Sequence, residues 1–309
     1  MKIIKDTKVF QIQEETAVAI GKFDGIHKGH QALLAELLRK KSMGLQTAIF
    51  TFDPPATTFF QKGDNICKDI ATREEKRDLF REIGVDYLIE YPLDEETAHM
   101  EPQLFVWNVL CNQMNMKYLV AGADVSFGYK GKGNALLLQE LESVYQYNMA
   151  IVDKVSYEEH IISSTYIRSK ILDGNMNLVT KLLGRPYSFV GNIIPGKQLG
   201  RTIDMPTANL IPDECKLIPP CGVYYSKVLR NGMFYNAISN VGYKPTVTIE
   251  QKLLIETYLF DFAEDLYGEV LEVFLLEYKR PEYKFTSFVQ LTETIQQDKQ
   301  DATVYFAQI

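Results

Sequence analysis

The sequence has few of the residues that build disulfide frameworks, metal sites or membrane spans. It contains four cysteines and four histidines among 309 residues, and no two cysteines form a Cys-x-x-Cys pair. We therefore expect neither a zinc site nor a disulfide framework. No run of about 18 apolar residues is present, and the first residues, MKIIKDTKVFQIQEE, hold no apolar stretch of signal-peptide length. These absences predict a cytoplasmic protein without a membrane partner.

Positive charge is also in deficit. Asp and Glu number 40 against 33 Lys and Arg, which gives a formal net charge of -7. Proteins that bind nucleic acid or a membrane surface usually present a basic face, so the balance argues against such partners. The composition, 46% hydrophobic and 24% charged, is ordinary for a globular protein. Typical domains hold roughly 100–150 residues, so the length favours two domains.

The first part of the chain alternates short apolar runs with helical patterns. Apolar residues repeat with helical spacing over residues 32–40, and Thr72 with Glu75 forms a capping box for a helix that Gly84 ends. The expected strands are residues 17–20, 47–52, 85–91, 118–121 and 150–155. This alternation predicts an α/β domain over residues 1–183, with a Rossmann-like, doubly wound parallel sheet. Ligands of such sheets bind at the carboxyl ends of the strands.

From about Tyr187 the pattern changes to period two, with frequent Gly and Pro. Asn231-Gly232 between two such runs, residues 222–229 and 233–239, predicts a tight hairpin. Further strands are expected at residues 256–262 and 270–276. A final helical stripe consists of Phe288, Leu291, Ile295, Ala302 and Phe306. Residues 187–309 are therefore expected to form a small antiparallel β-barrel with a C-terminal helix.

Two of the four histidines lie in one glycine-rich turn, residues 21–30, between an expected strand and an expected helix. The glycines allow a phosphate to approach the backbone, and the helix start favours an anion. The imidazoles of His27 and His30 can donate to oxygens that gain charge during phosphoryl transfer. The alternative is a surface turn that happens to hold two histidines. The candidate phosphate-binding residues of this turn are Gly21, Phe23, Asp24 and Gly29.

A second polar segment, Ser163-Ser164-Thr165-Tyr166-Ile167-Arg168, follows the last expected strand and enters a helix. Ser164 or Thr165 could simply cap that helix, and the segment alone leaves this open. Arg168 adds a cation one turn further on, suited to a triphosphate. The glycine-rich run over residues 128–133 lacks the order of a phosphate loop, and a mobile lid and a plain solvated loop both remain open.

The second half holds its own candidate nucleotide site. Its backbone and basic candidates are Gly196, Lys197, Gly200 and Arg201. Thr207 and Asn209 follow in Pro206-Thr207-Ala208-Asn209, and their oxygens are hard ligands suited to Mg²⁺. A β-turn that starts with Pro is the alternative.

The turn at residues 21–30, the segment 163–168 and the run Gly122-Ala123-Asp124-Val125-Ser126-Phe127-Gly128 resemble the HxGH nucleotidyltransferase superfamily. More closely, they resemble the adenylyltransferase module of prokaryotic bifunctional riboflavin kinase/FAD synthetase. The resemblance implies transfer of AMP from ATP to FMN, assisted by Mg²⁺, with release of pyrophosphate. It also implies that Asp124 and Phe127 help to form the flavin and ATP pockets.

The second half resembles the riboflavin kinase module of the same family, in the same order. The matching runs are residues 196–209, 222–224, 240–246 and 256–262, with Arg280 and Lys284-Phe285 before the last helix. The resemblance implies that Thr207 and Asn209 hold the Mg²⁺–nucleotide, that Asn240 contributes to flavin binding, and that Glu256 is the general base. By itself, a glutamate on a strand is more typical of a solvated face.

The chain departs from the family pattern at several positions. The family usually carries Phe-Glu-Pro-His-Pro after the second strand, where this chain has Phe52-Asp53-Pro54-Pro55, and Lys22 replaces a more common Asn. Asp204-Met205 and Tyr258 also replace a usual Gly-Phe and His. The expected activity is phosphorylation of riboflavin to FMN and adenylylation of FMN to FAD, with riboflavin, FMN, FAD and ATP as small-molecule partners. Two alternatives remain open. One is a riboflavin kinase with an impaired or lost adenylyltransferase domain, and the other is a non-catalytic flavin-binding regulator.

Overall fold

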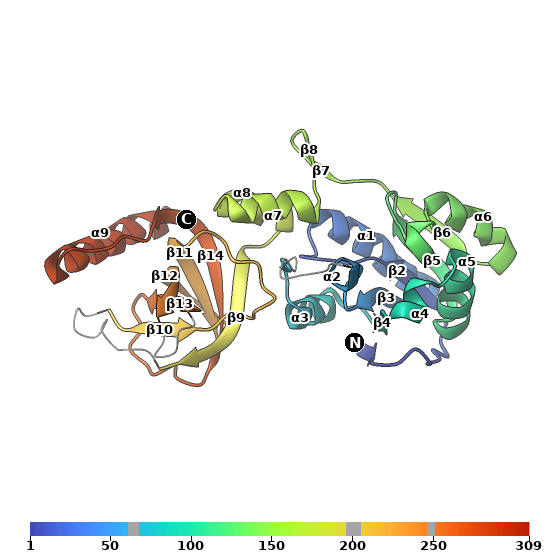
Figure 1. Cartoon of the computed structure of the whole chain (residues 1–309), viewed down its shortest axis with the longest axis horizontal. Coiled ribbons are helices and arrows are strands. Elements are labelled where there is room, and N and C mark those ends of the chain that lie inside the picture. The colour runs from blue at the N-terminus through green and yellow to red at the C-terminus, as the bar shows by residue number, and fades with distance from the viewer. Residues whose placement is uncertain (61–67, 196–204, 246–250, 309) are drawn as a thin grey trace. The chain divides into compact units, whose positions relative to one another are not determined.

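The computed structural model describes residues 1–60, 68–195, 205–245 and 251–308. The chain divides into two compact units, Met1–Ser164 and Thr165–Ile309. The first unit is built on an open parallel sheet and the second on a closed antiparallel barrel, both visible in Figure 1. The fold class expected from the sequence is confirmed in both parts.

The sheet of the first unit has six strands in the order β1-β4-β3-β2-β5-β6, and all neighbours are parallel. The strands are β1 (Lys2–Lys5), β2 (Thr16–Ile20), β3 (Gln46–Asp53), β4 (Tyr87–Pro92), β5 (Met116–Gly122) and β6 (Asn148–Val152). After β4 the strand order continues on the other side of β2, so β2 and β5 lie side by side with their connections diverging. This point is where doubly wound sheets bind their ligands.

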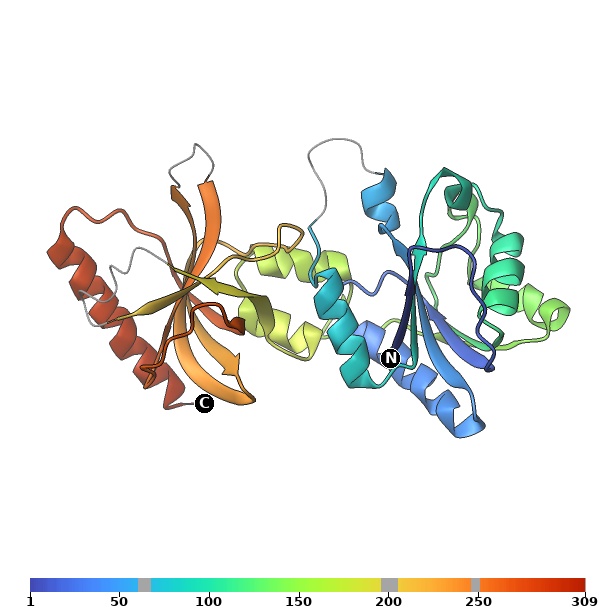
Figure 2. The same ribbon diagram turned by 90° about the horizontal axis from the view of Figure 1, so that it is seen from below.

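Helices cover both faces of this sheet (Figure 2). Ala17 and Ala19 pack into one buried cluster with side chains of α1 and α3, whereas Val18 and Ile20 pack into another with side chains of η2 and α6. The alternation follows from the period of two along a strand. The helices are α1 (Lys28–Arg39), η1 (Lys40–Met43), α2 (Ala56–Phe60), α3 (Arg73–Ile83), α4 (Glu95–Ala98), α5 (Pro102–Leu104), η2 (Phe105–Gln113), η3 (Tyr129–Gly131) and α6 (Ala135–Tyr145). A short hairpin, β7 (Ser156–Tyr157) and β8 (His160–Ile161), precedes α7 (Ser164–Leu172).

Local signals set most element ends. The capping box of α3 is present in both directions, and Gly84 ends the helix in the left-handed region. In contrast, α1 begins at Lys28, four residues before the expected start, because the His27 side chain caps it. The strand expected over residues 150–155 ends at Val152.

The barrel closes in the order β10-β13-β12-β11-β14-β9. Its strands are β9 (Tyr187–Ile194), β10 (Thr207–Leu210), β11 (Gly222–Arg230), β12 (Met233–Pro245), β13 (Gln251–Leu259) and β14 (Val270–Pro281), and α8 (Met176–Leu183) precedes them. Arg230 pairs with Met233, so Asn231 and Gly232 alone make the turn, with φ of 51° and 78°. Positive φ at both positions explains the Asn-Gly sequence. The predicted hairpin is therefore confirmed.

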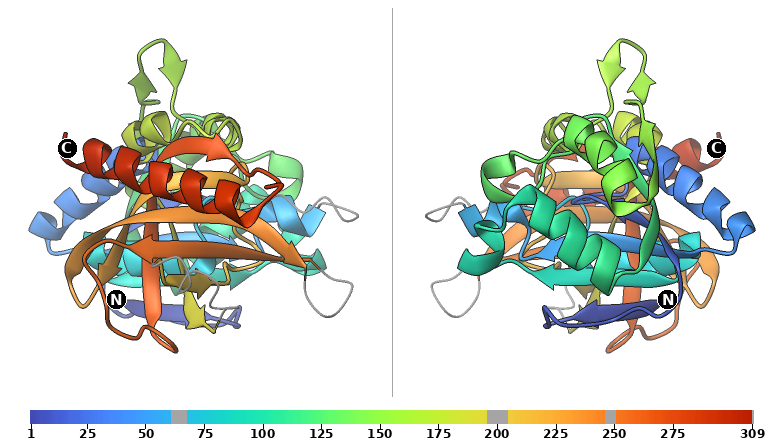
Figure 3. Two further views of the ribbon diagram at one scale, coloured as in Figure 1. Left: turned by 90° about the vertical axis from the view of Figure 1, so that its left-hand side faces the viewer. Right: turned by 90° about the vertical axis from the view of Figure 1, so that its right-hand side faces the viewer.

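The C-terminal helix α9 (Phe288–Phe306) lies across the outer face of the barrel, as the left view of Figure 3 shows. Ala302 is fully buried there, in a cluster with Val223, Tyr225 and Ile238. Phe288, expected on the buried stripe, is 61% exposed instead. Val289 is 64% exposed as well, so the apolar stripe is buried at Ala302 but not in the first turn of the helix.

Candidate functional site

The histidine turn lies at the switch point of the sheet. Residues 21–27 follow β2, and residues 123–128 follow the adjacent β5, so both segments start at the carboxyl edge. Phe23 and Ile26 have φ of 50° and 41°, a region that L-residues rarely adopt. Such backbone strain is typical of functional turns that the surrounding structure holds in place.

Buried hydrogen bonds fix this turn. Asp24 is 1% exposed, and its Oδ1 accepts from the backbone N–H groups of Ile70 and Ala71, at 2.9 and 3.4 Å. The carbonyl oxygen of Asp24 accepts from the Ser164 hydroxyl at 3.1 Å. The two sequence segments that were expected to share a site are therefore joined directly. Asp24 acts on the backbone here, and Ser164 is the first residue of α7.

The two imidazoles stack on each other at the start of α1. Their ring centroids are 3.7 Å apart with an interplanar angle of 17°. His27 Nδ1 accepts the backbone N–H of His30 at 3.3 Å, so a neutral His27 carries its proton on Nε2. His27 is thereby held as an Nε2–H donor.

His30 occupies a more apolar place, between His27 and the ring of Phe23, whose centroid is 5.2 Å away. Its Nδ1 is buried and has no hydrogen-bond partner among the described residues. Burial, followed by the charges of His27 and Lys76, holds the pKa of His30 well below its usual range. The imidazole is neutral near pH 7, and a buried unpartnered nitrogen in this position is suited to a ligand.

Gly29 permits the stack. A Cβ at this position would lie 3.1 Å from both Cε1 and Nδ1 of His27 and 3.6 Å from the Ile162 carbonyl oxygen. A side chain at position 29 would therefore require the His27 ring to shift by a few tenths of an ångström. The other members of the second segment, Thr165 and Arg168, lie in the first two turns of α7.

The residues expected to contact flavin after β5 have different surroundings. Asp124 is largely exposed, and its Oδ2 lies 3.0 Å from Lys154 Nζ. Phe127 is 5% exposed and packs against Phe105 in the sheet core. A backbone bridge between Phe127 and Gly133 closes the glycine-rich loop. Phe127 therefore anchors the glycine-rich loop to the core of the domain, whereas the side chain of Asp124 is accessible to a ligand.

The segment after β3, where the family histidine is replaced, contacts the histidine turn through a lysine. Lys22 Nζ donates to the Thr57 hydroxyl at 2.7 Å, and Thr57 lies two residues after Pro55. Arg73 at the start of α3 pairs with Asp53 at the end of β3. Lys22 has no ion pair within the described residues. Its ammonium is therefore available to an anion at this edge of the sheet.

In the second unit, strand register gathers the kinase candidates. Asn209 on β10 pairs with Glu256 on β13, and Glu256 pairs with Asn240 on β12. The row continues through Val223 to Arg280. Cross-strand partners point to the same face, so these side chains project together from the outer side of the barrel.

Carboxylates and amides form a polar group along this row. Asn240 Nδ2 donates to Glu282 Oε1 at 2.9 Å. Arg280 donates to Asp298 on α9, with Nε 3.0 Å from Oδ1. Both carboxylates, Glu282 and Asp298, were missed in the sequence, because no spacing links them to β12 or β13. The sequence signal nearest to them was Arg280.

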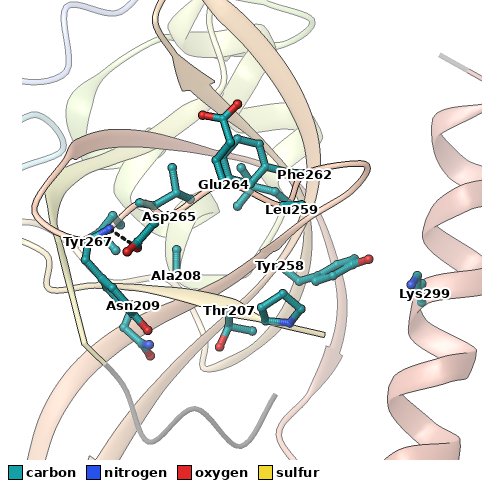
Figure 4. Close-up of a pocket in the computed structure, with 14 residues that line it drawn as sticks. Thr207, Ala208, Asn209, Tyr258, Leu259, Phe262, Glu264, Asp265, Tyr267 and Lys299 are labelled. Atoms are coloured by element: carbon teal, nitrogen blue, oxygen red, sulfur yellow. Dashed lines mark hydrogen bonds between the residues drawn. The ribbon is translucent and has the colours of Figure 1, made fainter. Parts of the chain in front are cut away.

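A pocket of about 510 Å³ opens beside this row (Figure 4). Thr207 and Asn209 form one wall, and Tyr258 faces Lys299 of α9. The far wall comes from residues 262–267, where Asp265 accepts the backbone N–H of Tyr267 at 3.0 Å. The candidates Gly196, Lys197, Gly200 and Arg201 lie outside the described residues. The pocket thus combines an oxygen-bearing wall with an aromatic one.

Comparisons with known proteins match both units. The model of the FAD synthetase family matches residues 9–166, and that of the riboflavin kinase family matches residues 183–306. A bifunctional riboflavin kinase/FMN adenylyltransferase of Listeria monocytogenes is 36% identical over 94% of this chain and 93% of its own length. Its namesakes in Bacillus subtilis and Escherichia coli are both 34% identical, over 96% and 95% of this chain and 94% of their own lengths.

A solved structure from Streptococcus pneumoniae is also similar. That protein, described as a macrolide-efflux protein, is 32% identical over 97% of this chain and 98% of its own, with a TM-score of 0.86. Within the described ranges of the present chain, no helix is both long and apolar enough to cross a membrane.

Proposed function

Because the chain belongs to the family of bifunctional riboflavin kinase/FMN adenylyltransferases, we propose roles for its residues in the two reactions of that family. The enzyme phosphorylates riboflavin to FMN with ATP, and adenylylates FMN to FAD with release of pyrophosphate. We assign residues 1–183 to adenylylation and residues 187–309 to phosphorylation. This assignment gives helices α7 and α8 to the adenylylation domain, whereas the division into compact units falls after Ser164.

In adenylylation, an oxygen of the FMN phosphate attacks the α-phosphorus of ATP, and the bond from that phosphorus to the pyrophosphate oxygen breaks. His27 Nε2–H and His30 donate to the phosphate oxygens as charge develops on them. Gly21, Phe23, Asp24 and Gly29 shape the turn around the triphosphate. Arg168, with Ser163, Ser164 and Thr165 at the start of α7, supplies further donors.

Two further parts of this domain support the same reaction. Asp124, with Phe127 beneath it, borders the flavin site after β5. The family usually has a phosphate-facing histidine where this chain has Pro55. Lys22 supplies a positive charge toward the phosphates in its place. Its ammonium, held by Thr57, faces the same edge of the sheet.

In phosphorylation, the ribityl hydroxyl of riboflavin attacks the γ-phosphorus of ATP, and ADP leaves. The carboxylate of Glu256 takes the hydroxyl proton as the new P–O bond forms. The single observation that supports this assignment is the register that places Glu256 between Asn209 and Asn240. Asn240, fixed on Glu282, orients the flavin hydroxyls toward Glu256.

The oxygen ligands beside Glu256 fit Mg²⁺. Thr207 and Asn209 alternate with Ala208 on β10, so both side chains lie on the same face. No group of three His, Cys, Asp or Glu residues suited to a metal exists within the described part of the chain. Mg²⁺ fits such a site because it is usually held by few protein ligands together with substrate phosphates. The ion would neutralise phosphate charge there, and Gly196, Lys197, Gly200 and Arg201 would surround the phosphates.

Two substitutions test these assignments in one polypeptide. Glu256→Gln removes the base and should lower FMN formation by about 10²–10⁴-fold, while FAD formation from supplied FMN stays unchanged. His30→Ala should do the converse. Equal loss of both activities in either variant would contradict the separate sites. A wild-type enzyme that makes FMN but no FAD would instead favour the kinase with an impaired adenylyltransferase, which the replacement at Pro55 suggests.

A further inference from the structure

One turn of α9 is pinned to the barrel at three points. Asp298 is 6% exposed and accepts from the guanidinium of Arg280. Asp301 Oδ2 lies 2.6 Å from Lys279 Nζ. Between them, Lys299 holds its Nζ 5.0 Å from the ring centroid of Tyr258. The buried Asp298 anchors the turn of α9 that carries the adjacent Lys299, so the fold sets the position of Lys299.

Lys299 has an unusual charge environment. It lines the same pocket as Thr207 and Asn209, and Figure 4 shows it opposite Tyr258. Within the described residues it has no ion pair, and the two acidic side chains that line this pocket have other partners. Glu264 pairs with Arg230 at 2.6 Å, and Asp265 accepts from the Tyr267 backbone. The ammonium therefore rests on the negative face of an aromatic ring.

The register places this cation close to the reacting phosphates. Tyr258 pairs with Thr207 on β10, as Glu256 pairs with Asn209. Two residues along a strand span about 7 Å, so the Thr207–Tyr258 pair lies one step from the general base on the same face. A triphosphate held by Thr207 and Asn209, with its γ-phosphorus near Glu256, lies within reach of a lysine over Tyr258.

We infer that Lys299 binds the phosphates of the nucleotide in the kinase reaction, so that α9 supplies part of the nucleotide site. The inference rests on the proposed placement of the nucleotide at Thr207 and Asn209. The ammonium donates to phosphate oxygens and offsets the charge that Mg²⁺ leaves uncompensated. The ring of Tyr258 keeps the side chain turned into the pocket when the nucleotide is absent.

Three variants of the full-length enzyme separate binding from helix anchoring. Lys299→Met should raise KM for MgATP in FMN formation about tenfold, with a smaller change in kcat, since a charge-assisted hydrogen bond is lost. Lys299→Arg should retain most of the affinity. Lys279→Met is the matched control, because it also removes a lysine that contacts α9 but one that lies outside the pocket. It should leave KM for MgATP unchanged. FAD formation from FMN should stay at the wild-type rate in all three.

Inhibition constants identify the part of the nucleotide that is bound. In Lys299→Met, inhibition by MgADP should weaken about tenfold while inhibition by adenosine stays the same. An unchanged KM, an equal rise of KM in Lys279→Met, or equal weakening of ADP and adenosine would each overturn the inference.

Asn209→Ala, measured alongside, tests the placement on which the inference rests. If Asn209→Ala impairs FMN formation and Lys299→Met does not, the role of Lys299 alone is wrong. If Asn209→Ala has no effect, the nucleotide is placed wrongly and both claims fail.

Discussion

The buried histidine of the adenylyltransferase site should make its domain lose stability in mild acid. Burial and the neighbouring charges of His27 and Lys76 depress the pKa of His30 in the folded protein. An unfolded chain binds the proton near pH 6.5, whereas the folded chain does not. Protonation of His30 therefore costs the fold little free energy of unfolding above about pH 6.5. Below that value the free energy of unfolding falls with pH, until the folded form also takes up the proton.

The size of the effect follows from linkage. If His30 stays neutral in the folded state down to pH 5.5, the free energy of unfolding falls by about 1.4 kcal/mol between pH 7.5 and 5.5. For a unit of this size, that corresponds to a decrease in Tm of about 3–5 °C. Carboxylates with a depressed pKa, such as Asp94 with a pKa of about 2, lose their contribution to stability only as the pH falls further toward that pKa. They do not dominate in this window.

The chain offers its own reporter for this measurement. Its single tryptophan, Trp107, lies on η2 in the first unit, so the fluorescence of the full-length protein follows unfolding of that unit. Thermal scans at pH 7.5, 6.5 and 5.5 should show the decrease in wild type and a smaller one in His30→Gln. His99→Gln is the control, because the His99 side chain is 61% exposed. If His30→Gln keeps the full pH dependence, or if His99→Gln removes it, His30 is not the titrating group and the reasoning is refuted.

Two further substitutions test the same site through its chemistry. Gly29→Ala places a methyl group 3.1 Å from the His27 ring, so it should displace the imidazole that caps α1. FAD formation should fall about tenfold, whereas FMN formation, the control, should not change. A wild-type rate of FAD formation would show that the stacked geometry is not needed. Lys22→Met removes the ammonium held by Thr57 and should raise KM for FMN or ATP in adenylylation about tenfold; unaltered kinetics would remove Lys22 from the phosphate site.

Residues that interact with near neighbours were predictable from the sequence. Thr72 and Glu75 form their capping box, and Asn231-Gly232 forms its turn, because both motifs depend only on the adjacent backbone. The start of α1 was misplaced for a local reason as well. His27 replaces the usual Ser, Thr, Asp or Asn as the capping residue, and its imidazole nitrogen performs the same function.

The assembly of the kinase row could not be read from the sequence. Asn209, Asn240 and Glu256 meet because β13 pairs with both β10 and β12, and pairing between distant strands depends on the whole barrel. The same holds for Asp298, which reaches Arg280 only because α9 packs on the outer face. Periodicity identified the apolar stripe of α9. It could not show which residues of the stripe contact the barrel, and Phe288 is exposed. The resemblance to the family supplied Glu256, and the register explains why that residue is well placed.

The most direct test is a chromatographic time course of the purified protein with riboflavin, ATP and Mg²⁺, run for wild type, Glu256→Gln and His30→Ala. The account predicts FMN followed by FAD in wild type, FMN formation slowed by about 10²–10⁴-fold in Glu256→Gln, and FMN that accumulates without FAD in His30→Ala. FMN formation by Glu256→Gln at the wild-type rate, or FAD formation by His30→Ala at that rate, would contradict it.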